Sequence, residues 1–259
     1  MKALKFIGII GLVFILSVNY YASDKNNKKI NQGSKTVSKL LKHIVHISNN
    51  DIRFCTEKGI CVFIDPVSWP TDDLVIRSKM IKPDLILITH SHEDHFQPTI
   101  IQEYLRLNPK TILCGPHDVV ERLKIKGINA IEVSSNNIYT MAGIKFNTAP
   151  AYFTLEDAGH PLANHWVGYI LQLDGTNYYV TGDTQSFPEM AEFKVDVIFP
   201  LLFGCGGNLE DAVKMAEITC AKLVVPVHTD GQEQSIKNYL NRLPKGVKGA
   251  YYIDTKLIF

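Results

Sequence analysis

The run DLILITHSHEDH, residues 84–95, decides how this chain folds. Its first half is an uninterrupted apolar stretch of the length that a buried strand needs, and its second half holds three histidines and an aspartate within six residues. Side chains alternate between two faces in extended chain, so His90 and His92 point to the same side. Asp94 and His95 follow where the chain turns towards a helix. Because imidazole and carboxylate are the ligands of Zn²⁺ in hydrolytic sites, this spacing indicates a metal site.

Two further apolar runs also lead into a potential ligand. YYVTG is followed by Asp183, and KLVVPV is followed by His228. Taken alone, Asp183 is explained as well by a turn as by metal binding, and His228 is better explained as a structural histidine. Sites in layered α/β proteins are built at the carboxyl ends of buried strands, where the strand fixes the backbone and the departing loop aims the side chains. We therefore expect six ligands to converge on one rim: His90, His92, Asp94, His95, Asp183 and His228.

The remainder of the chain alternates short β-branched runs with helical patterns, which indicates a layered α/β domain. Strands are expected at residues 44–47, 52–54, 61–64, 84–89, 111–114, 144–147, 167–173, 178–181 and 223–227. Helices are expected at residues 98–108, 118–126 and 208–220. No internal repeat is present.

Length and composition set the broad class of protein. The 259 residues are 46% hydrophobic and 20% charged, which excludes a disordered, collagenous or multi-span membrane chain and fits one domain. Lys and Arg number 27 against 26 Asp and Glu, a formal net charge of +1, and no long basic block interrupts the folded part. Nucleic acid is therefore not an expected partner, and a small-molecule substrate is.

The N-terminus departs from this average composition. Lys2 and Lys5 precede the apolar run 6–18, whose 13 residues fit the core of a secretory signal and fall short of a membrane span. Residues 1–22 are predicted to be a signal peptide, or an uncleaved N-terminal anchor, because Tyr20 stands where a small residue usually precedes a cleavage site at Ala22. Residues 23–40 are predicted to be a polar linker. Export to the periplasm or the cell exterior follows, with membrane anchoring as the alternative.

Five cysteines are unusual for an exported chain, because five cannot all pair internally. Cys55 and Cys61 flank a predicted hairpin turn, so they form either a cross-strand disulfide or two buried thiols. The sequence contains no CxxC spacing, and cysteine is not the first candidate for metal binding or redox chemistry.

The motifs resemble those of the metallo-β-lactamase fold superfamily, in which HxHxDH is the signature and here reads HSHEDH after Thr89. The order FIDP, APAY, HPLANHWVGYI, TGDT, FPEM and PVH is similar to that of small single-domain hydrolases related to ascorbate-phosphate lactonase. The resemblance covers nearly all of residues 41–259. It implies a four-layer αβ/βα sandwich, with two facing sheets, helices outside and a metal site at one edge.

The resemblance also implies a role for each ligand. His90 and His92 would bind a first metal, Asp94, His95 and His228 a second, and Asp183 would bridge both. The chain departs from the family at Phe153, which follows Pro-Ala-Tyr where relatives carry another first-metal ligand. Phenylalanine cannot ligate a metal, so His160 or His165 must replace it, with His160 preferred, or the first site is incomplete. Position 180 is Val where many relatives have His.

Two functions are consistent with these residues. The first is a metal-dependent hydrolase that uses one or two Zn²⁺ ions, or Mn²⁺, to activate water against a lactone, phosphodiester or similar ester, with Asp94 as the catalytic residue that moves the proton. The second is a non-catalytic metal- or ligand-binding protein on a degraded hydrolase scaffold, which Phe153 motivates. Cys205, within a glycine-rich loop, either borders the site without a role or contacts metal or substrate.

Overall fold

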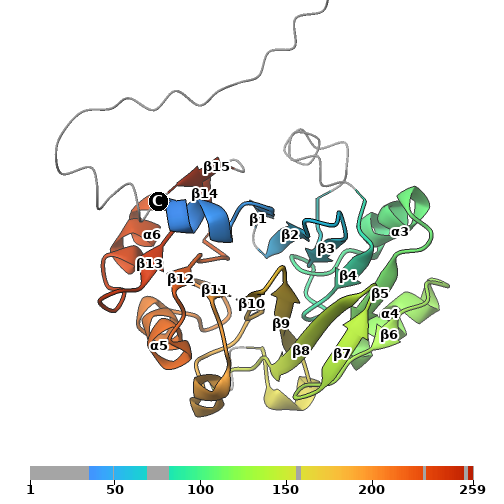
Figure 1. The fold of residues 1–259 in the computed structure, drawn as a ribbon. Coiled ribbons are helices and arrows are strands. Elements are labelled where there is room, and N and C mark those ends of the chain that lie inside the picture. The colour runs from blue at the N-terminus through green and yellow to red at the C-terminus, as the bar shows by residue number, and fades with distance from the viewer. Residues whose placement is uncertain are drawn as a thin grey trace, which may run out of the picture.

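The computed structural model describes residues 35–48, 50–68, 82–155, 159–229, 232–253 and 256–258, which form two large sheets and one small one (Figure 1). The first large sheet contains, in spatial order, β1 (Ile44–Ser48), β2 (Asp51–Cys55), β3 (Cys61–Ile64), β4 (Leu85–Leu87), β5 (Ile112–Gly115) and β6 (Ile131–Glu132). β1, β2 and β3 pair antiparallel as a meander, and β3 to β6 pair parallel.

The second large sheet joins an antiparallel half to a parallel half. Its antiparallel strands are β7 (Ile138–Met141), β8 (Ile144–Pro150), β9 (Val167–Leu173) and β10 (Thr176–Val180). β10 continues in parallel to β11 (Val197–Phe199), β12 (Leu223–Val224) and β13 (Lys248–Gly249). A separate antiparallel pair is formed by β14 (Tyr251–Ile253) and β15 (Lys256–Ile258).

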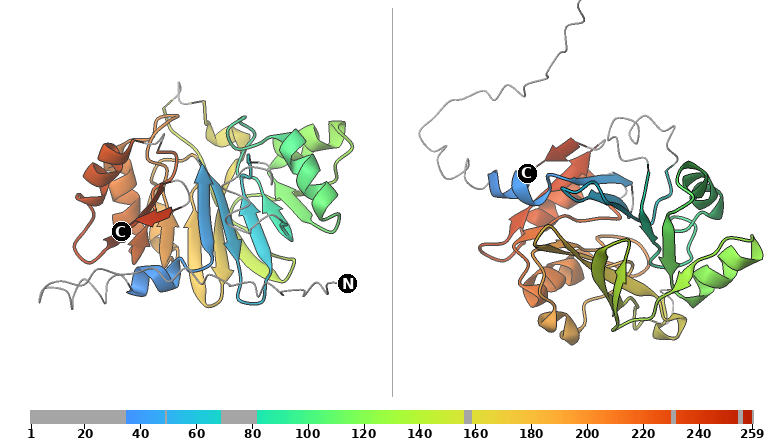
Figure 2. Two further views of the ribbon diagram at one scale, coloured as in Figure 1. Left: turned by 90° about the horizontal axis from the view of Figure 1, so that it is seen from above. Right: turned by 45° about the vertical axis from the view of Figure 1, so that its right-hand side comes forward.

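Helices cover the outer face of each sheet, so the domain has four layers (Figures 1 and 2). The main core lies between the sheets, where Phe54 of β2 packs against Tyr178 and Phe199 of the second sheet. α3 (Pro98–Leu107) and α4 (His117–Ile125) pack on the first sheet through a second apolar cluster. α5 (Leu209–Thr219), α6 (Glu233–Leu240) and the short 3₁₀ segment η3 (Pro188–Glu192) pack on the other sheet. The predicted αβ/βα sandwich is confirmed.

The strongly patterned elements lie where the sequence predicts them. α3 begins at Pro98 as expected, and Asn208 caps α5 by accepting a hydrogen bond from the backbone N–H of Asp211 at 2.9 Å. The predicted strand 84–89 is shorter than expected, because the chain leaves the sheet after Leu87. The sequence prediction omitted the short strands β6, β7, β11 and β13 to β15, the helix α6, and the 3₁₀ segments η2 (Leu162–Asn164) and η3.

The folded domain begins earlier than the predicted boundary at residue 41. Residues 35–40, placed in the linker by composition, are helical, and Val37 is only 3% exposed in the main core. Val37, Leu40 and Leu41 share one helix face at the three- and four-residue spacing of an amphipathic helix. The predicted leader, residues 1–22, lies outside the described residues. None of the helices in the described part of the chain is long and apolar enough to cross a membrane.

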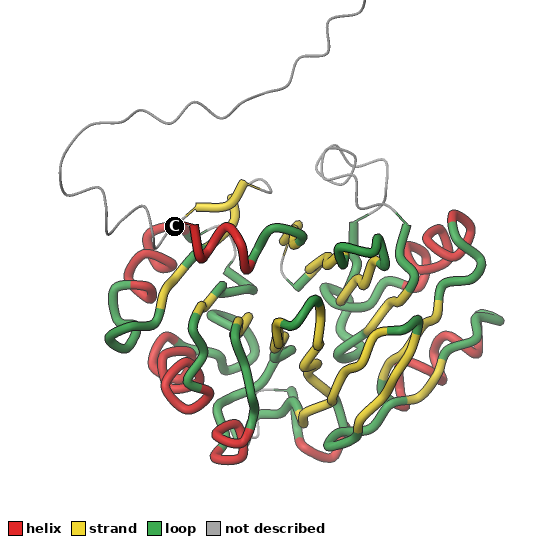
Figure 3. The backbone as a smooth tube through the Cα atoms, in the orientation of Figure 1, coloured by secondary structure: helices red, strands yellow, loops and turns green. Residues whose placement is uncertain are grey.

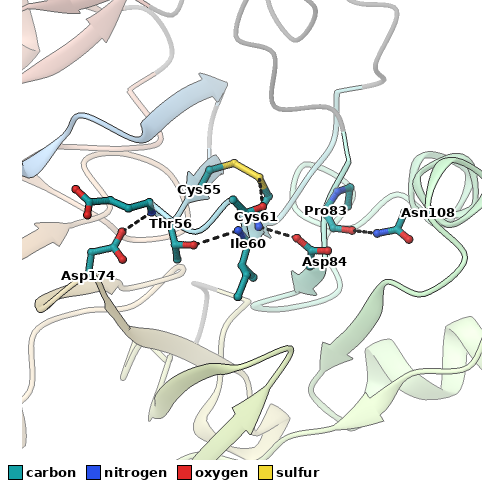
Figure 4. The surroundings of a disulfide bond; sticks show 10 residues. Cys55, Thr56, Ile60, Cys61, Pro83, Asp84, Asn108 and Asp174 are labelled. Carbon is teal, nitrogen blue, oxygen red and sulfur yellow. Dashed lines mark hydrogen bonds between the residues drawn. A yellow bond between two sulfur atoms is a disulfide. The ribbon is translucent and has the colours of Figure 1, made fainter.

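The two cysteines of the β2–β3 hairpin form a disulfide (Figure 4). Cys55 and Cys61 stand directly opposite each other in the antiparallel register, which brings their Cα atoms to 4.1 Å. The backbone N–H of Cys61 donates to the carboxylate of Asp84 at 2.8 Å, so the hairpin is tied to the start of β4. Of the two sequence alternatives, the structure therefore has the disulfide, and Cys114, Cys205 and Cys220 remain as free thiols.

Figure 3 shows the strands of the two large sheets facing each other, with the helices outside. Within each sheet the parallel strands direct their carboxyl ends to one edge of the sandwich. Asp65 follows β3 and the HSHEDH segment follows β4 in the first sheet. Asp183 follows β10 in the second sheet, and His228 follows an isolated bridge between Val227 and Leu201. The fold thus carries side chains from distant parts of the sequence to a single edge.

Candidate metal centre

The HSHEDH segment is anchored at its base by one buried carboxylate. Asp65 accepts hydrogen bonds from the backbone N–H of Thr89 at 2.7 Å and from the Thr89 hydroxyl at 2.6 Å. The same carboxylate accepts from Nδ1 of His95 at 2.8 Å. Because the Thr89 hydroxyl gives its proton to Asp65, its oxygen serves as the acceptor for Nδ1 of His90 at 2.9 Å.

This chain of hydrogen bonds fixes the tautomers of two histidines. His90 and His95 each carry a proton on Nδ1, so each turns Nε2 into the interior of the site. Carboxylates or hydroxyls that hold the outer ring nitrogen in this way are the usual support of histidines that bind metals. The arrangement therefore prepares both rings to act as ligands.

A first cluster of donors consists of His90, His92 and His160, whose ligand atoms lie within 4.8 Å of one another. Nε2 of His160 is 3.4 Å from Nε2 of His90. Oδ2 of Asp183 faces both rings, 3.9 Å from Nε2 of His90 and 3.6 Å from Nε2 of His160. Asp183 is 1% exposed, and its Oδ2 accepts no hydrogen bond from the described residues although it is fully buried.

A second cluster consists of Asp94, His95 and His228, again within 4.8 Å of one another. Oδ2 of Asp94 lies 2.9 Å from Nε2 of His228 and 3.5 Å from Nε2 of His95. The other oxygen of Asp183, Oδ1, is 3.4 Å from Nε2 of His95. Asp183 thus stands between the two clusters with one oxygen towards each. All seven residues predicted as ligands are brought together here.

His160 lies beside Phe153, the position at which the resemblance leaves the first site without a ligand. Phe153 is 4% exposed and its ring meets the His160 ring edge-on, with 5.7 Å between the centroids. The backbone N–H of Phe153 donates to the carbonyl of His160 at 2.8 Å, so the two residues are held side by side. His165, the other candidate, is exposed at the end of η2 and does not join either cluster.

Trp166 packs against all three histidines of the first cluster. Its ring centroid is 4.9 Å from each of His90, His92 and His160, and its indole N–H donates to Asp118 at 3.0 Å. Trp166 therefore packs against the imidazole rings of the site itself.

The electrostatics of the site favour a bound cation. The partners His228 and His95 lower the pKa of Asp94, so its carboxyl is ionised at neutral pH. Burial opposes ionisation of Asp183, but the surrounding histidines lower its pKa far more than burial raises it. Burial and the neighbouring His95 hold the pKa of His90 well below its usual value, so its imidazole is neutral. Ionised carboxylates and neutral imidazoles are the protonation states that metal binding requires.

His95 carries the positive charge that balances these carboxylates. Burial lowers its pKa, but Asp183, Asp65 and Asp94 together raise it well above the usual value. A divalent cation would replace that proton as the partner of the same carboxylates.

Two supporting residues were not predicted from the sequence. Asp65 is described above, and the second is Asn50, a fully buried side chain between β1 and β2. Its amide nitrogen lies 3.1 Å from Nδ1 of His95 and donates to Oδ1 of Asp183 at 3.3 Å. The signal for Asp65 was available, because it follows a buried strand as the ligands do. Asn50 sits in a short turn with no such pattern.

The donor set fits metal ions. Imidazoles and carboxylates converge from separate elements, and the buried oxygen Oδ2 of Asp183 receives from the described residues none of the hydrogen bonds that burial normally demands. Such an orphaned acceptor costs roughly 1–3 kcal/mol unless it is satisfied, which a cation would do. The residues present are therefore able to hold one ion in each cluster.

A groove of about 760 Å³ adjoins the first cluster. Its lining includes His92 and Trp166 of the site together with Arg122 of α4 and Glu132 of β6. Nη1 of Arg122 donates to the carbonyl of Ser91 at 3.0 Å. The charged lining contains both signs, since Asp118 and His117 also border it.

Comparisons with known proteins agree with the fold and with a dependence on metal. A sequence model of the "Beta-lactamase superfamily domain" matches residues 50–228. The chain is 32% identical to a "UPF0173 metal-dependent hydrolase" of Methanoculleus marisnigri, over 58% of this chain and 67% of that protein. It is 29% identical to one of Thermococcus kodakarensis, over 68% of this chain and 80% of that protein. A crystal structure of a metal-dependent hydrolase from Parabacteroides distasonis superposes with a TM-score of 0.65 at 24% identity, covering 80% of this chain and 91% of that one.

Proposed function

The chain belongs to the β-lactamase superfamily and is a metal-dependent hydrolase of the metallo-β-lactamase fold, and we propose that it uses two zinc ions to hydrolyse a lactone, a phosphodiester or a similar small ester. The observation that carries this proposal is the convergence of two donor clusters on the shared carboxylate of Asp183.

The ligand roles follow from the two clusters. His90, His92 and His160 would hold the first ion, and Asp94, His95 and His228 the second, with Asp183 shared. Zinc is proposed because imidazole outnumbers carboxylate in both clusters together, and nitrogen-rich sites suit zinc better than magnesium or calcium. When bound, a pair of such ions lowers the pKa of water towards 7 and stabilises negative charge on a carbonyl or phosphoryl oxygen.

Asp94 is the residue that we propose moves the proton. Its side chain is 41% exposed, whereas Asp183 and Asp65 are almost completely buried. Among these carboxylates, it is therefore the one that substrate and water can reach. Its lowered pKa keeps it ionised, so it can accept a proton from the attacking water and then deliver it to the leaving group. His228 holds Oδ2 of Asp94 at 2.9 Å and orients this carboxylate.

The groove beside His92 suggests the class of substrate. Arg122 and His117 supply positive groups, and Glu132 and Asp118 supply negative ones, so the lining does not select a polyanion. The ion pair between Nδ1 of His117 and Glu132 at 2.9 Å further neutralises this wall. These features support a small substrate with little net charge, such as a lactone or a single phosphodiester, and give no support for nucleic acid.

The non-catalytic alternative loses its main support. It rested on the loss of a ligand at Phe153, and the structure brings His160 to within 3.4 Å of His90 beside that position. A degraded scaffold would not be expected to retain a buried replacement histidine in contact with the remaining donors.

We also propose that the chain is exported. The N-terminal apolar run and the Cys55–Cys61 disulfide support an oxidising compartment, because cytosolic proteins rarely keep structural disulfides. Cell fractionation with intact-mass measurement tests this. A mature chain that begins near residue 23 outside the cytoplasm supports a cleaved signal, full-length chain in the membrane fraction supports an anchor, and full-length chain in the cytoplasm contradicts export.

The function is tested by turnover of a panel of lactones, phosphodiesters and β-lactams with zinc or manganese added. Asp183→Ala should abolish hydrolysis and remove at least one metal, whereas Glu217→Gln, an exposed carboxylate on α5, should change neither. His228→Ala should weaken the second ion, so part of the activity should return at high zinc. Metal uptake without turnover of any substrate class would favour a binding protein, and retention of metal and activity in Asp183→Ala would refute the site.

A further inference from the structure

The free thiol of Cys205 lies at the mouth of the metal centre, in the loop between β11 and α5. Gly204, Cys205 and Gly206 all have left-handed backbone, with φ of 87°, 45° and 97°. A Cβ on Gly204 would stand 2.8 Å from Cε1 of His228, so the glycine lets this loop approach the second cluster closely. The loop carries Cys205 towards the site rather than away from it.

Cys205 forms a third donor group with two residues of the site. Its Sγ, a ring nitrogen of His160 and a carboxylate oxygen of Asp183 all lie within 4.8 Å of one another. The other donors of the first cluster, His90 and His92, are both imidazoles. The thiol therefore adds a donor of a different kind to the first cluster.

A second observation shows that this space is built for a ligand. Oδ2 of Asp183 is fully buried and accepts no hydrogen bond from the described part of the chain, and it faces His160 at 3.6 Å. Buried carboxylate oxygens without partners are rare because their desolvation is costly. A cation between Asp183, His160 and Cys205 would satisfy this oxygen and would be within reach of the sulfur.

We propose that Cys205 binds, through Sγ, the metal ion that His160 and Asp183 hold in the first cluster. This inference rests on the proposed metal site and adds a ligand to it. On binding, the S–H bond breaks, the proton leaves to water, and the sulfur electron pair forms the bond to the metal. Thiolate is a soft ligand, so the first site discriminates in favour of zinc or cobalt and against manganese or magnesium.

The other free thiols of the described chain serve as controls. Cys114 is buried in β5 within the main core and belongs to neither cluster. Cys220 is exposed at the end of α5, where its Sγ contacts the carbonyl of Glu217 at 3.5 Å. Cys220 therefore offers a solvent-accessible thiol that no metal ion should protect.

Cobalt titration of the metal-free, disulfide-intact full chain tests the proposal. Thiolate bound to Co²⁺ gives a near-ultraviolet sulfur-to-metal charge-transfer absorption, which imidazole and carboxylate do not. We expect this absorption in the unmodified chain and in Cys220→Ser, and its loss in Cys205→Ser. Loss of a residue that only supports the ligands of a metal typically lowers metal affinity by roughly 10–100-fold. Loss of the ligand Cys205 should therefore lower the zinc affinity of the first site by at least that much.

Alkylation with iodoacetamide supplies a readout that needs no variant. Cys205 should react in the metal-free chain and be protected by zinc, while Cys220 should react equally in both states. Two results would overturn the role of Cys205 and leave the metal site intact. One is stoichiometric cobalt binding without the charge-transfer absorption, and the other is alkylation of Cys205 that zinc does not slow. Failure of the chain to bind cobalt at all would overturn the metal site and this proposal together.

Discussion

Gly204→Ala should weaken binding of the second metal ion without replacing any of its ligands. An alanine Cβ at this position would lie 2.8 Å from Cε1 and 3.1 Å from Nδ1 of His228. The closer of these contacts is about 0.6 Å short of the 3.4 Å at which ordinary van der Waals contact begins. The His228 ring must shift by a comparable distance, which breaks the 2.9 Å geometry between its Nε2 and Asp94.

The same substitution also forces an L-residue into left-handed backbone, which costs roughly 1–2 kcal/mol of unfolding free energy. Gly246→Ala is the matched control, because Gly246 has φ of 96° and no atom of the described chain lies within 4 Å of the position that a Cβ would take there. The left-handed backbone should therefore cost both variants a similar amount of stability, and the contact with His228 should add a further loss in Gly204→Ala alone. Only Gly204→Ala should lose metal affinity, by roughly 10–100-fold at the second site.

The assay is competition for zinc against a chromophoric chelator, combined with urea unfolding of each metal-free variant. Equal zinc affinities in Gly204→Ala and Gly246→Ala would refute the idea that the close approach of the loop positions His228.

Three further perturbations test the fold and the metal dependence. Arg53→Ala should lower the free energy of unfolding in urea by about 3–5 kcal/mol. Arg53 is fully buried and donates two hydrogen bonds of 2.9 Å to Asp51, whose charge would be left unpaired. A loss below about 1 kcal/mol would contradict this. Replacing Cys55 and Cys61 by serine should cost about 2 kcal/mol, since the closed loop is short, and unchanged stability would show that the disulfide does not constrain the unfolded chain. Zinc at about 100 times its dissociation constant should stabilise the metal-free chain by about 2.7 kcal/mol, and a melting temperature independent of zinc would argue against binding.

The convergence of the candidate ligands was predictable from sequence where they follow apolar strands. His90, His92, Asp94 and His95 lie in one short segment, and a buried parallel strand can deliver its following loop to only one edge. The convergence of distant segments on that edge follows from the same rule, which places Asp183 and His228 correctly.

His160 could be proposed but not placed from the sequence. It lies in a loop rather than after a strand, and only the structure shows that its ring meets Phe153 while the exposed His165 stays outside. Asn50 could not be found at all, because a single amide in a turn has no periodicity. The early helix at 35–40 was also missed, since its polar composition obscures the apolar face of Val37 and Leu40.

The metal content of the purified chain, measured by plasma mass spectrometry for the unmodified protein, His160→Ala and His165→Ala, tests the central claim most directly. Two ions per chain are expected in the unmodified protein and in His165→Ala, whose histidine is exposed and outside both clusters. His160→Ala should retain one ion, because the first cluster loses a buried donor 3.4 Å from His90 while the second stays complete. Two ions in His160→Ala, or fewer than two in the unmodified chain, would contradict the account.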